Sequence, residues 1–288
     1  MKTSKTTKTI AHISDLHFGR EDPGVVAGLR DALWAVEPDI VVVSGDLTQR
    51  AKKRQFRAAR SFLDGMPEVP RVIVPGNHDI SATNVFERVV RPLTRYKGYI
   101  TTDMSPFYSD ETVAIAGLDS VRLLSTKDGR LNRAQVEEAC RKLAGVSGDP
   151  VRIVVTHHPI DLPSTDRKHP TLSRARMAMG EFARCGVDLF LSGHLHGGLS
   201  LVTRERYPLE GYSAVVVHAG TAVSTRTRNE PNTFNLIRVE TDRIDIEQMV
   251  WGGKRFAKGE IARYRKSSDG WTASGVEEGV LLTEESIR

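Results

Sequence analysis

Cysteine is scarce in this chain of 288 residues, which contains only Cys140 and Cys185. Their spacing is neither that of a CxxC pair nor that of another metal-ligand motif, so the sequence predicts no thiolate metal site. So few thiols are typical of a reducing compartment rather than an oxidising one. We therefore expect two small core residues in a reducing environment.

Long apolar runs are equally lacking. No uninterrupted apolar stretch approaches about 18 residues, which predicts that no segment spans a membrane. Residues 1–9 are rich in Lys and Thr, and they lack the run of roughly 7 to 15 apolar residues that a signal peptide needs. Together these absences predict a cytoplasmic location.

The remaining composition is typical of a globular protein. Hydrophobic residues make up 39% of the chain, and the 24 glycines bring the apolar share near the usual value of about 45–50%, which excludes disorder throughout. The length fits one large domain or two small ones. A net charge of +5 favours an anionic partner only weakly, because a solvated basic surface explains it equally well.

Five short apolar runs recur along the chain, and each ends in His, Asp, Asn or Gly. Runs of this length that are rich in Val and Ile predict buried strands. The runs and the residues that follow them are 9–14 before Asp15, 39–44 before Gly45-Asp46, 71–75 before Gly76-Asn77-His78-Asp79, 152–156 before His157, and 187–192 before Gly193-His194-Leu195-His196.

Helical patterns connect these predicted strands. Apolar residues share one helical face over residues 25–36 and again over residues 56–63, and Asn132 with Gln135 resembles a capping box. Strands that alternate with helices predict an α/β fold with a largely parallel sheet. In such sheets ligands bind at the carboxyl ends of the strands.

The pattern changes towards the end of the chain. Residues 199–249 contain predicted strands without helices between them, which indicates a second, more antiparallel sheet. Residues 251–288 are Gly-rich and charged, with little periodicity. We expect one domain over residues 1–250 and a peripheral tail over residues 251–288.

The polar clusters offer suitable ligands to a metal. Asp15 and His17 are two residues apart, as are His194 and His196, and in an extended segment this spacing places both side chains of a pair on one side. Each pair could then hold one ion. Carboxylate, imidazole and amide groups suit Mn, Fe or Zn. A single strand-end histidine is more often structural, but five of the nine histidines lie in these clusters, which packing alone would rarely produce.

The motifs, in this order, resemble those of the calcineurin-like metallophosphoesterases over about residues 10–200. The resemblance implies two packed, mixed β-sheets flanked by helices, with a two-metal centre at the strand ends. One ion would be held by Asp15, His17, Asp46 and His196. The other would be held by Asp46, Asn77, His157 and His194.

The resemblance also implies hydrolysis of a phosphate ester. Asp46 would serve both ions because a carboxylate has two oxygens, and a hydroxide bridging the ions would attack the phosphorus. His78 matches the family position that faces the phosphate, where it would stabilise the transition state or protonate the leaving oxygen. A role without proton transfer is the alternative for His78. Asp79 would orient His78 or cap a helix, whereas His12 and His158 are expected to be structural.

The residues beside the ligands resemble those of one branch of the family. Asp79 after the histidine resembles both the bacterial cyclic-nucleotide phosphodiesterases and the DNA-repair nucleases. Together with the compact length and the run from Thr156 to Pro159, it is most similar to the cyclic-nucleotide phosphodiesterase and glycerophosphodiesterase branch. Ile160 departs from it, because members often have a second Pro there. Protein Ser/Thr phosphatases usually carry Glu at the position of Asp79, and lipid A pathway pyrophosphatases Arg at that of His78. The implied substrates are cyclic nucleotides or similar small phosphodiesters.

Several alternatives stay open at this point. A DNA or RNA nuclease would use the basic run over residues 50–60, but this run extends over more than three helical turns without alternating aromatic residues, and a solvated helix face explains it well. A nucleotide-lipid pyrophosphatase would use the same site. A non-catalytic binding module predicts broken ligand sets, whereas all seven positions hold suitable residues. Residues 81–110 either overhang the site or pack as helix, and the sequence leaves a monomer and a homodimer as alternatives.

Overall fold

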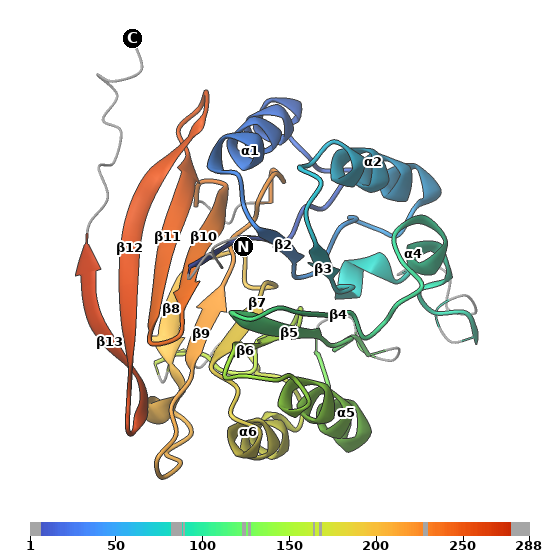
Figure 1. The fold of residues 1–288 in the computed structure, drawn as a ribbon. Helices are drawn as coiled ribbons and strands as arrows, with labels where there is room; N and C mark the ends of the chain where they lie inside the picture. Colours follow the sequence, from blue (N-terminus) through green and yellow to red (C-terminus); the bar gives the residue numbers. More distant parts are fainter. Residues whose placement is uncertain are drawn as a thin grey trace.

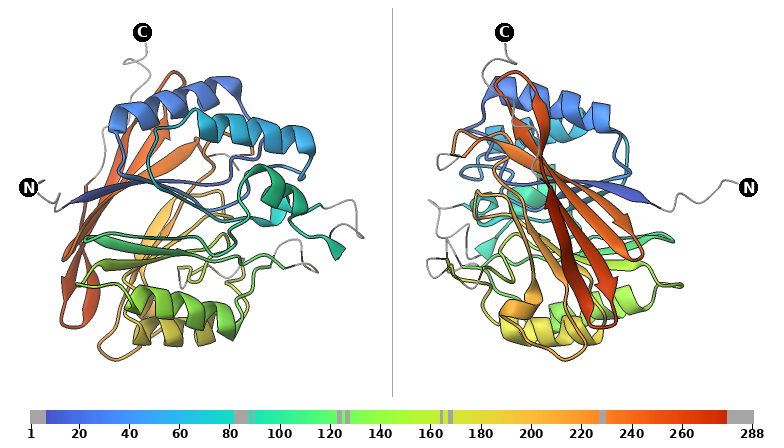
Figure 2. Two further views of the ribbon diagram at one scale, coloured as in Figure 1. Left: turned by 45° about the vertical axis from the view of Figure 1, so that its right-hand side comes forward. Right: turned by 90° about the vertical axis from the view of Figure 1, so that its left-hand side faces the viewer.

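Two β-sheets pack face to face, and helices cover their outer faces, which gives four layers (Figures 1 and 2). This arrangement confirms the predicted α/β class with two mixed sheets. The computed structural model describes residues 7–81, 88, 90–122, 125, 128–163, 165–166, 169–226 and 230–277.

The first sheet has seven strands in the order β13-β12-β11-β10-β1-β2-β3. Strands β1, β2 and β3 are parallel, and the remaining neighbours pair antiparallel. The strands are β1 (Lys8–Ile13), β2 (Ile40–Val43), β3 (Arg71–Ile73), β10 (Thr233–Glu240), β11 (Arg243–Trp251), β12 (Phe256–Ser267) and β13 (Gly270–Glu277).

The second sheet has six strands in the order β4-β5-β6-β7-β9-β8. Its four central strands are parallel, and the edge strands β4 and β8 run antiparallel to their neighbours. The strands are β4 (Phe107–Ser109), β5 (Val113–Gly117), β6 (Val151–Val155), β7 (Leu189–Ser192), β8 (Leu199–Val202) and β9 (Val215–His218).

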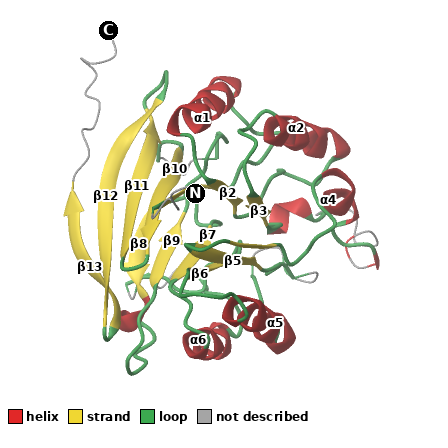
Figure 3. Cartoon of the chain, in the orientation of Figure 1, coloured by secondary structure: helices red, strands yellow, loops and turns green. Residues whose placement is uncertain are grey.

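Three helices, Pro23–Val36, Lys53–Asp64 and Arg133–Ala144, lie where the apolar patterns and the capping box predict them, whereas the helix Ala175–Arg184 was not predicted (Figure 3). The Asn132 side chain accepts from the N–H of Gln135 at 2.9 Å and the Gln135 side chain accepts in return at 3.0 Å, which confirms the capping box. No described helix is long and apolar enough to cross a membrane. The helices are α1 (Pro23–Val36), α2 (Lys53–Asp64), α4 (Thr94–Tyr99), α5 (Arg133–Ala144) and α6 (Ala175–Arg184), with short 3₁₀ helices η1 (Asn77–Asp79) and η2 (Thr203–Glu205).

Three apolar cores separate the four layers. The side chains of a strand alternate between the two faces of its sheet, so Ile10 of β1 packs between the sheets while Ala11 and Ile13 pack under α1 and α2. In the second sheet, Val154 faces α5 and α6, whereas Ile153 and Val155 face the first sheet. Because both faces of these strands are covered, they read in the sequence as continuous apolar runs.

The strands after residue 199 do not form a sheet of their own, which corrects the prediction. β8 and β9 complete the second sheet, whereas β10 pairs antiparallel with β1 and carries β11 into the first sheet. Pattern alone could not assign these strands, because an antiparallel strand has the same period of two at the edge of either sheet.

The expected peripheral tail is also wrong for residues 256–277, which form β12 and β13. Trp271 is fully buried, and its indole N–H donates to Asp188 at 2.8 Å, which ties β13 to the second sheet. The period of two is present in the sequence, where buried Ala262 and Tyr264 alternate with Arg263 and Arg265, but glycines and charged residues on either side obscure it. Residues 278–288 lie outside the described part.

Within residues 81–110, α4 packs against the first sheet, whereas β4 belongs to the second sheet. Tyr96 is fully buried, and its hydroxyl donates to the carbonyl of Ile73 at 3.2 Å. Tyr99 stacks on Phe56 of α2 with ring centroids 6.1 Å apart. These two aromatic residues therefore serve packing, which was one of the two predicted roles.

A disulfide joins Cys140 of α5 to Cys185 at the end of α6, with Cα atoms 5.5 Å apart. The prediction of two separate core residues is therefore wrong, because the spacing of 45 residues carried no sign that the two helices are neighbours. We expect Cys140→Ser to lower the free energy of unfolding by about 2–4 kcal/mol without reductant, since the cross-link restricts the unfolded chain.

Denaturant melts of the wild-type protein and of Cys140→Ser, with and without dithiothreitol, test this expectation. The two proteins should differ only without reductant. Two reactive thiols in denatured, unreduced wild-type protein would contradict the disulfide.

Candidate metal centre

Seven polar side chains from five strand ends come together at one edge of the two sheets. Four follow strands of the first sheet and three follow strands of the second. They are Asp15 and His17 after β1, Asp46 after β2, Asn77 after β3, His157 after β6, and His194 and His196 after β7. All seven predicted ligands therefore lie at the carboxyl ends of parallel strands.

The backbone at these residues is not extended, which differs from the expectation. Nine described non-glycine residues have positive φ, and five of them belong to this site: Asp15 (53°), His17 (45°), Asp46 (52°), His194 (75°) and His196 (67°). Such conformations are costly for residues with a Cβ and persist where the surroundings impose them. Here the loops bind one another, with the N–H of Asp15 donating to Gly45 at 3.1 Å and that of His17 donating to Asp46 at 2.9 Å.

The first group of ligands comprises Asp15, His17 and His196, all buried, whose ligand atoms lie within 4.8 Å of one another. Asp46 connects this group to the next one. Its carboxylate lies 3.7 Å from Nε2 of His17 and 3.4 Å from Nε2 of His157.

The second group contains Asn77, His157 and His194. Nε2 of His157 lies 3.1 Å from Oδ1 of Asn77 and 3.3 Å from Nδ1 of His194. His194 and His196 thus belong to different groups, so the idea that this pair holds one ion is wrong. The left-handed backbone turns their side chains apart, and the resulting division is the one that the family resemblance implies.

The first group is suited to a cation because several of its buried polar atoms make no hydrogen bond with the described residues. Within the described part of the chain, Oδ1 of Asp15 and both ring nitrogens of His17 have no hydrogen-bond partner. Buried polar atoms are usually satisfied, because leaving them without a partner costs about 1–3 kcal/mol each. A metal ion between them would supply that partner.

Neighbouring groups fix the orientation of other ligands. Nδ1 of His157 donates to the carbonyl of Ser44 at 2.8 Å, which leaves Nε2 facing Asp46. Nδ1 of His196 lies 2.6 Å from the hydroxyl of Thr221. Such contacts are typical of metal-binding histidines, because they select the tautomer and the ring orientation.

The charges in the cluster support its use as a cation site. Burial raises the pKa of the Asp46 carboxyl, but the neighbouring His157 outweighs burial and holds this pKa well below its usual value. Burial lowers the pKa of His157, but Asp46 outweighs it and raises that pKa to about 9, so a metal ion would have to displace the proton on Nε2 to bind there. At His194, burial and then His157 lower the pKa to about 4, which keeps this ring neutral and able to bind a metal.

His78 stands beside the cluster, as predicted, but its partners differ from those expected. Its Nδ1 donates to the carbonyl of Gln49 at 2.8 Å, and its Nε2 lies 3.3 Å from Nη1 of Arg226. The N–H of His78 donates to Asp46 at 2.8 Å. Gln49 and Arg226 therefore position the ring, and neither carried a sequence signal, since Arg226 lies 30 residues beyond the last motif.

Of the two roles predicted for Asp79, the structure favours the helix cap, because its carboxylate bonds the N–H of Gly76 at the start of η1, and among the described residues no hydrogen bond joins it to the His78 ring. The buried Asp79 carboxylate accepts from the N–H groups of Gly76 at 3.0 Å, Leu47 at 3.1 Å and Thr48 at 2.9 Å. Burial, followed by the charge of Asp46, raises the pKa of Asp79 to about 6. Asp79 therefore fastens the loop after β3 to the loop after β2.

The remaining buried histidines include one that sequence reasoning misplaced. His158 was expected to be structural, yet its ring centroid is 4.7 Å from that of His194, it could share a metal ion with His157 and His194, and its Nδ1 contacts the hydroxyl of Ser120 at 2.9 Å. His12 is buried in β1 as predicted, with Nε2 bonded to Ser44 at 2.9 Å.

Residues 8–198 match the family model described as calcineurin-like phosphoesterase. Because this match covers more than half of the chain, the protein belongs to the calcineurin-like phosphoesterase family.

Two curated relatives are distant. The chain is 29% identical over 164 residues to the glycerophosphodiester phosphodiesterase GpdQ of Enterobacter lignolyticus, covering 53% of this chain and 58% of that protein. It is 28% identical over 200 residues to the uncharacterized protein YpbG of Bacillus subtilis, covering 67% of this chain and 63% of that protein. The chain thus spans less than two thirds of the length of both relatives.

Solved structures share the fold at low sequence identity. PhoD superimposes with a TM-score of 0.70 at 9% identity, over 97% of this chain and 73% of PhoD. The purple acid phosphatase PPD1 from yellow lupin superimposes with a TM-score of 0.65 at 13% identity, over 88% of this chain and 53% of that one. At these identities the likeness concerns the fold alone.

Proposed function

We propose that this protein is a phosphodiesterase that uses two transition-metal ions, Mn, Fe or Zn, to hydrolyse small phosphodiesters such as cyclic nucleotides or glycerophosphodiesters. The convergence of seven Asp, His and Asn side chains in two groups that share Asp46 carries the proposal. Family membership supports the hydrolysis of a phosphoester, and the similarity to a protein described as a glycerophosphodiester phosphodiesterase supports a diester substrate.

When bound, two such ions would lower the pKa of a water molecule and neutralise charge that develops on the phosphoryl oxygens. The chain supplies orientation and proton transfer. Because Nδ1 of His78 donates to the carbonyl of Gln49, its Nε2 carries the lone pair and faces Nη1 of Arg226 at 3.3 Å. Once a bound phosphate ester takes over the Arg226 contact, this nitrogen can exchange a proton with an ester oxygen. Arg226 adds a positive charge next to the position of the phosphate.

A substrate panel with defined Mn, Fe and Zn loading tests the proposal. It comprises bis(p-nitrophenyl) phosphate, 2′,3′- and 3′,5′-cyclic nucleotides, glycerophosphodiesters, nucleotide-lipid pyrophosphates, DNA and p-nitrophenyl phosphate. We expect metal-dependent cleavage with a higher kcat/KM for small diesters than for the monoester. Preferred cleavage of DNA or of the pyrophosphates would replace the proposal with one of those activities, and cleavage of none would favour a binding module.

A further inference from the structure

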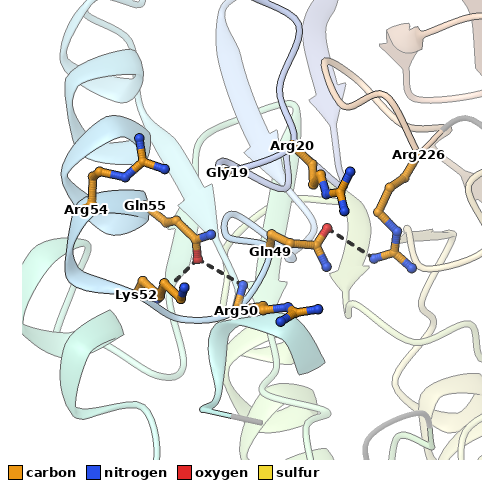
Figure 4. A pocket seen from close by; sticks show the side chains of 8 residues that line it. All are labelled: Gly19, Arg20, Gln49, Arg50, Lys52, Arg54, Gln55 and Arg226. Atoms are coloured by element: carbon orange, nitrogen blue, oxygen red, sulfur yellow. Dashed lines mark hydrogen bonds between the residues drawn. The ribbon is translucent and has the colours of Figure 1, made fainter. Parts of the chain in front are cut away.

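A basic pocket of about 670 Å³ adjoins the candidate metal centre (Figure 4). Two of the residues that line it, Gln49 and Arg226, are the residues that hold the His78 ring. The pocket therefore continues from the place where the scissile phosphate would lie. Its volume is within the range of about 300–1,000 Å³ that is usual for small-molecule sites.

Five of the eight residues that line the pocket are basic, and none is acidic. The basic residues are Arg20, Arg50, Lys52, Arg54 and Arg226. Among the described residues, none of the five takes part in an ion pair. Glu21 follows Arg20 in the chain, but its carboxylate accepts from the N–H of Gly19 and does not line the pocket. A bound anion would relieve the mutual repulsion of the five basic side chains.

The loop that carries Arg50 and Lys52, just before α2 with Arg54, is held in place by the buried side chain of Gln55. Oε1 of Gln55 accepts from the N–H of Arg50 at 2.9 Å and from that of Lys52 at 3.2 Å. The position of Gln55 requires a glycine at residue 19, because a Cβ on Gly19 would lie 2.0 Å from Nε2 of Gln55. The cations thus project from a backbone whose shape does not depend on a ligand.

The basic run over residues 50–60 is thereby divided. Arg50, Lys52 and Arg54 line the pocket with Arg20 and Arg226, which come from distant parts of the chain, whereas Arg57 does not line it. If the basic run only formed a solvated helix face, Arg20 and Arg226 would have no reason to lie beside it.

We propose that the pocket binds a second anionic group of the substrate, namely a phosphomonoester on one of the two alcohols that the scissile phosphate joins. This inference rests on the proposed function and narrows its substrate class. A dianionic phosphate accepts several charge-assisted hydrogen bonds from guanidinium groups, which suits a site with four arginines. Because no aromatic residue lines the pocket, it offers no base-stacking platform, which favours a small ester over a nucleic acid strand.

Two chromogenic esters that differ by one phosphate test the proposal. They are thymidine 5′-(p-nitrophenyl phosphate) and the same compound with a 3′-phosphate. We expect kcat/KM to be about tenfold higher for the 3′-phosphorylated ester, and Arg54→Gln to reduce this ratio about five- to tenfold. Arg57→Gln removes an equal charge one turn further along α2, outside the pocket, and should leave the ratio unchanged.

Binding to the metal-free protein separates this inference from the proposed function. Isothermal titration with the 3′-phosphorylated ester should show weaker binding to Arg54→Gln than to Arg57→Gln, whether or not the loaded enzyme cleaves diesters. Equal binding to both variants, or equal kcat/KM for both esters, would overturn the inference. If single-stranded DNA displaced the ester at a lower concentration than thymidine 3′,5′-bisphosphate does, the pocket would be a nucleic acid site and the inference would be overturned. Arg54-dependent binding without any turnover would contradict only the proposed function.

Discussion

Asp46→Asn is expected to reduce metal-dependent diester hydrolysis by at least about 10³-fold. The Asp46 carboxylate lies between the two ligand groups, within 3.4 Å of His157 and 3.7 Å of His17. Oδ2 of Asp46 faces both histidines and Oδ1 accepts from the N–H of His78, so an uncharged amide would either turn its NH₂ towards the cations or lose the bond from His78. Two-metal stabilisation of the transition state contributes several kcal/mol, and each 1.4 kcal/mol corresponds to about tenfold in rate.

The measurement is kcat/KM with bis(p-nitrophenyl) phosphate, together with the metal content of the purified variant. Asp119→Asn is the matched control, because this half-buried carboxylate follows β5, accepts from the N–H of Val121 at 2.8 Å and belongs to none of the ligand groups. The control should retain activity. Full activity and full metal content in Asp46→Asn would show that Asp46 is not a ligand of the metal centre.

Metal loading is expected to raise the melting temperature by roughly 5–10 °C at a free metal concentration about 100 times the dissociation constant. The bound ion would stabilise the folded state by about 2.7 kcal/mol under those conditions, and one kcal/mol shifts Tm by about 2–4 °C in a protein approaching this size. The physical reason is that buried Oδ1 of Asp15 and Nε2 of His17 lie 3.4 Å apart without a hydrogen bond to any residue that the structure describes, and the ion would satisfy both atoms.

Differential scanning fluorimetry of chelator-treated protein with added Mn²⁺ or Zn²⁺ measures this shift. His17→Asn should lose most of it. His169→Asn should keep it, because His169 lies outside the ligand groups and contacts Asp166 at 2.9 Å. A shift of equal size in both variants would mean that the ions bind elsewhere.

The positions of the ligands could be predicted from sequence because they depend on a local rule. Asp15, Asp46, Asn77 and His157 each follow a buried apolar run, and the carboxyl ends of parallel strands lie at one edge of a sheet. The division of the ligands between two groups came from the family resemblance rather than from spacing, which assumed an extended backbone that His194 and His196 do not have.

The other differences arise from contacts between residues far apart in the chain. Arg226 reaches His78 across 148 positions, and Trp271 reaches Asp188 across 83, so no short window of sequence contains either pair. Cys140 and Cys185 become neighbours only because α5 packs against α6. One predicted role linked Asp79 to His78, its neighbour in the chain, although its partners Leu47 and Thr48 lie in the loop after β2.

The division of the ligands between two sheets has a consequence for the dynamics of this protein. Asp15 and His17 belong to one sheet and His196 to the other, so an ion bound by all three would bridge the apolar core that separates the sheets. Any opening motion that slides one sheet over the other would then have to break coordination bonds. Amide hydrogen exchange in β1, β2, β6 and β7 should therefore slow together when metal is added, as one cooperative unit, while the outer hairpin of β12 and β13 keeps its own rate.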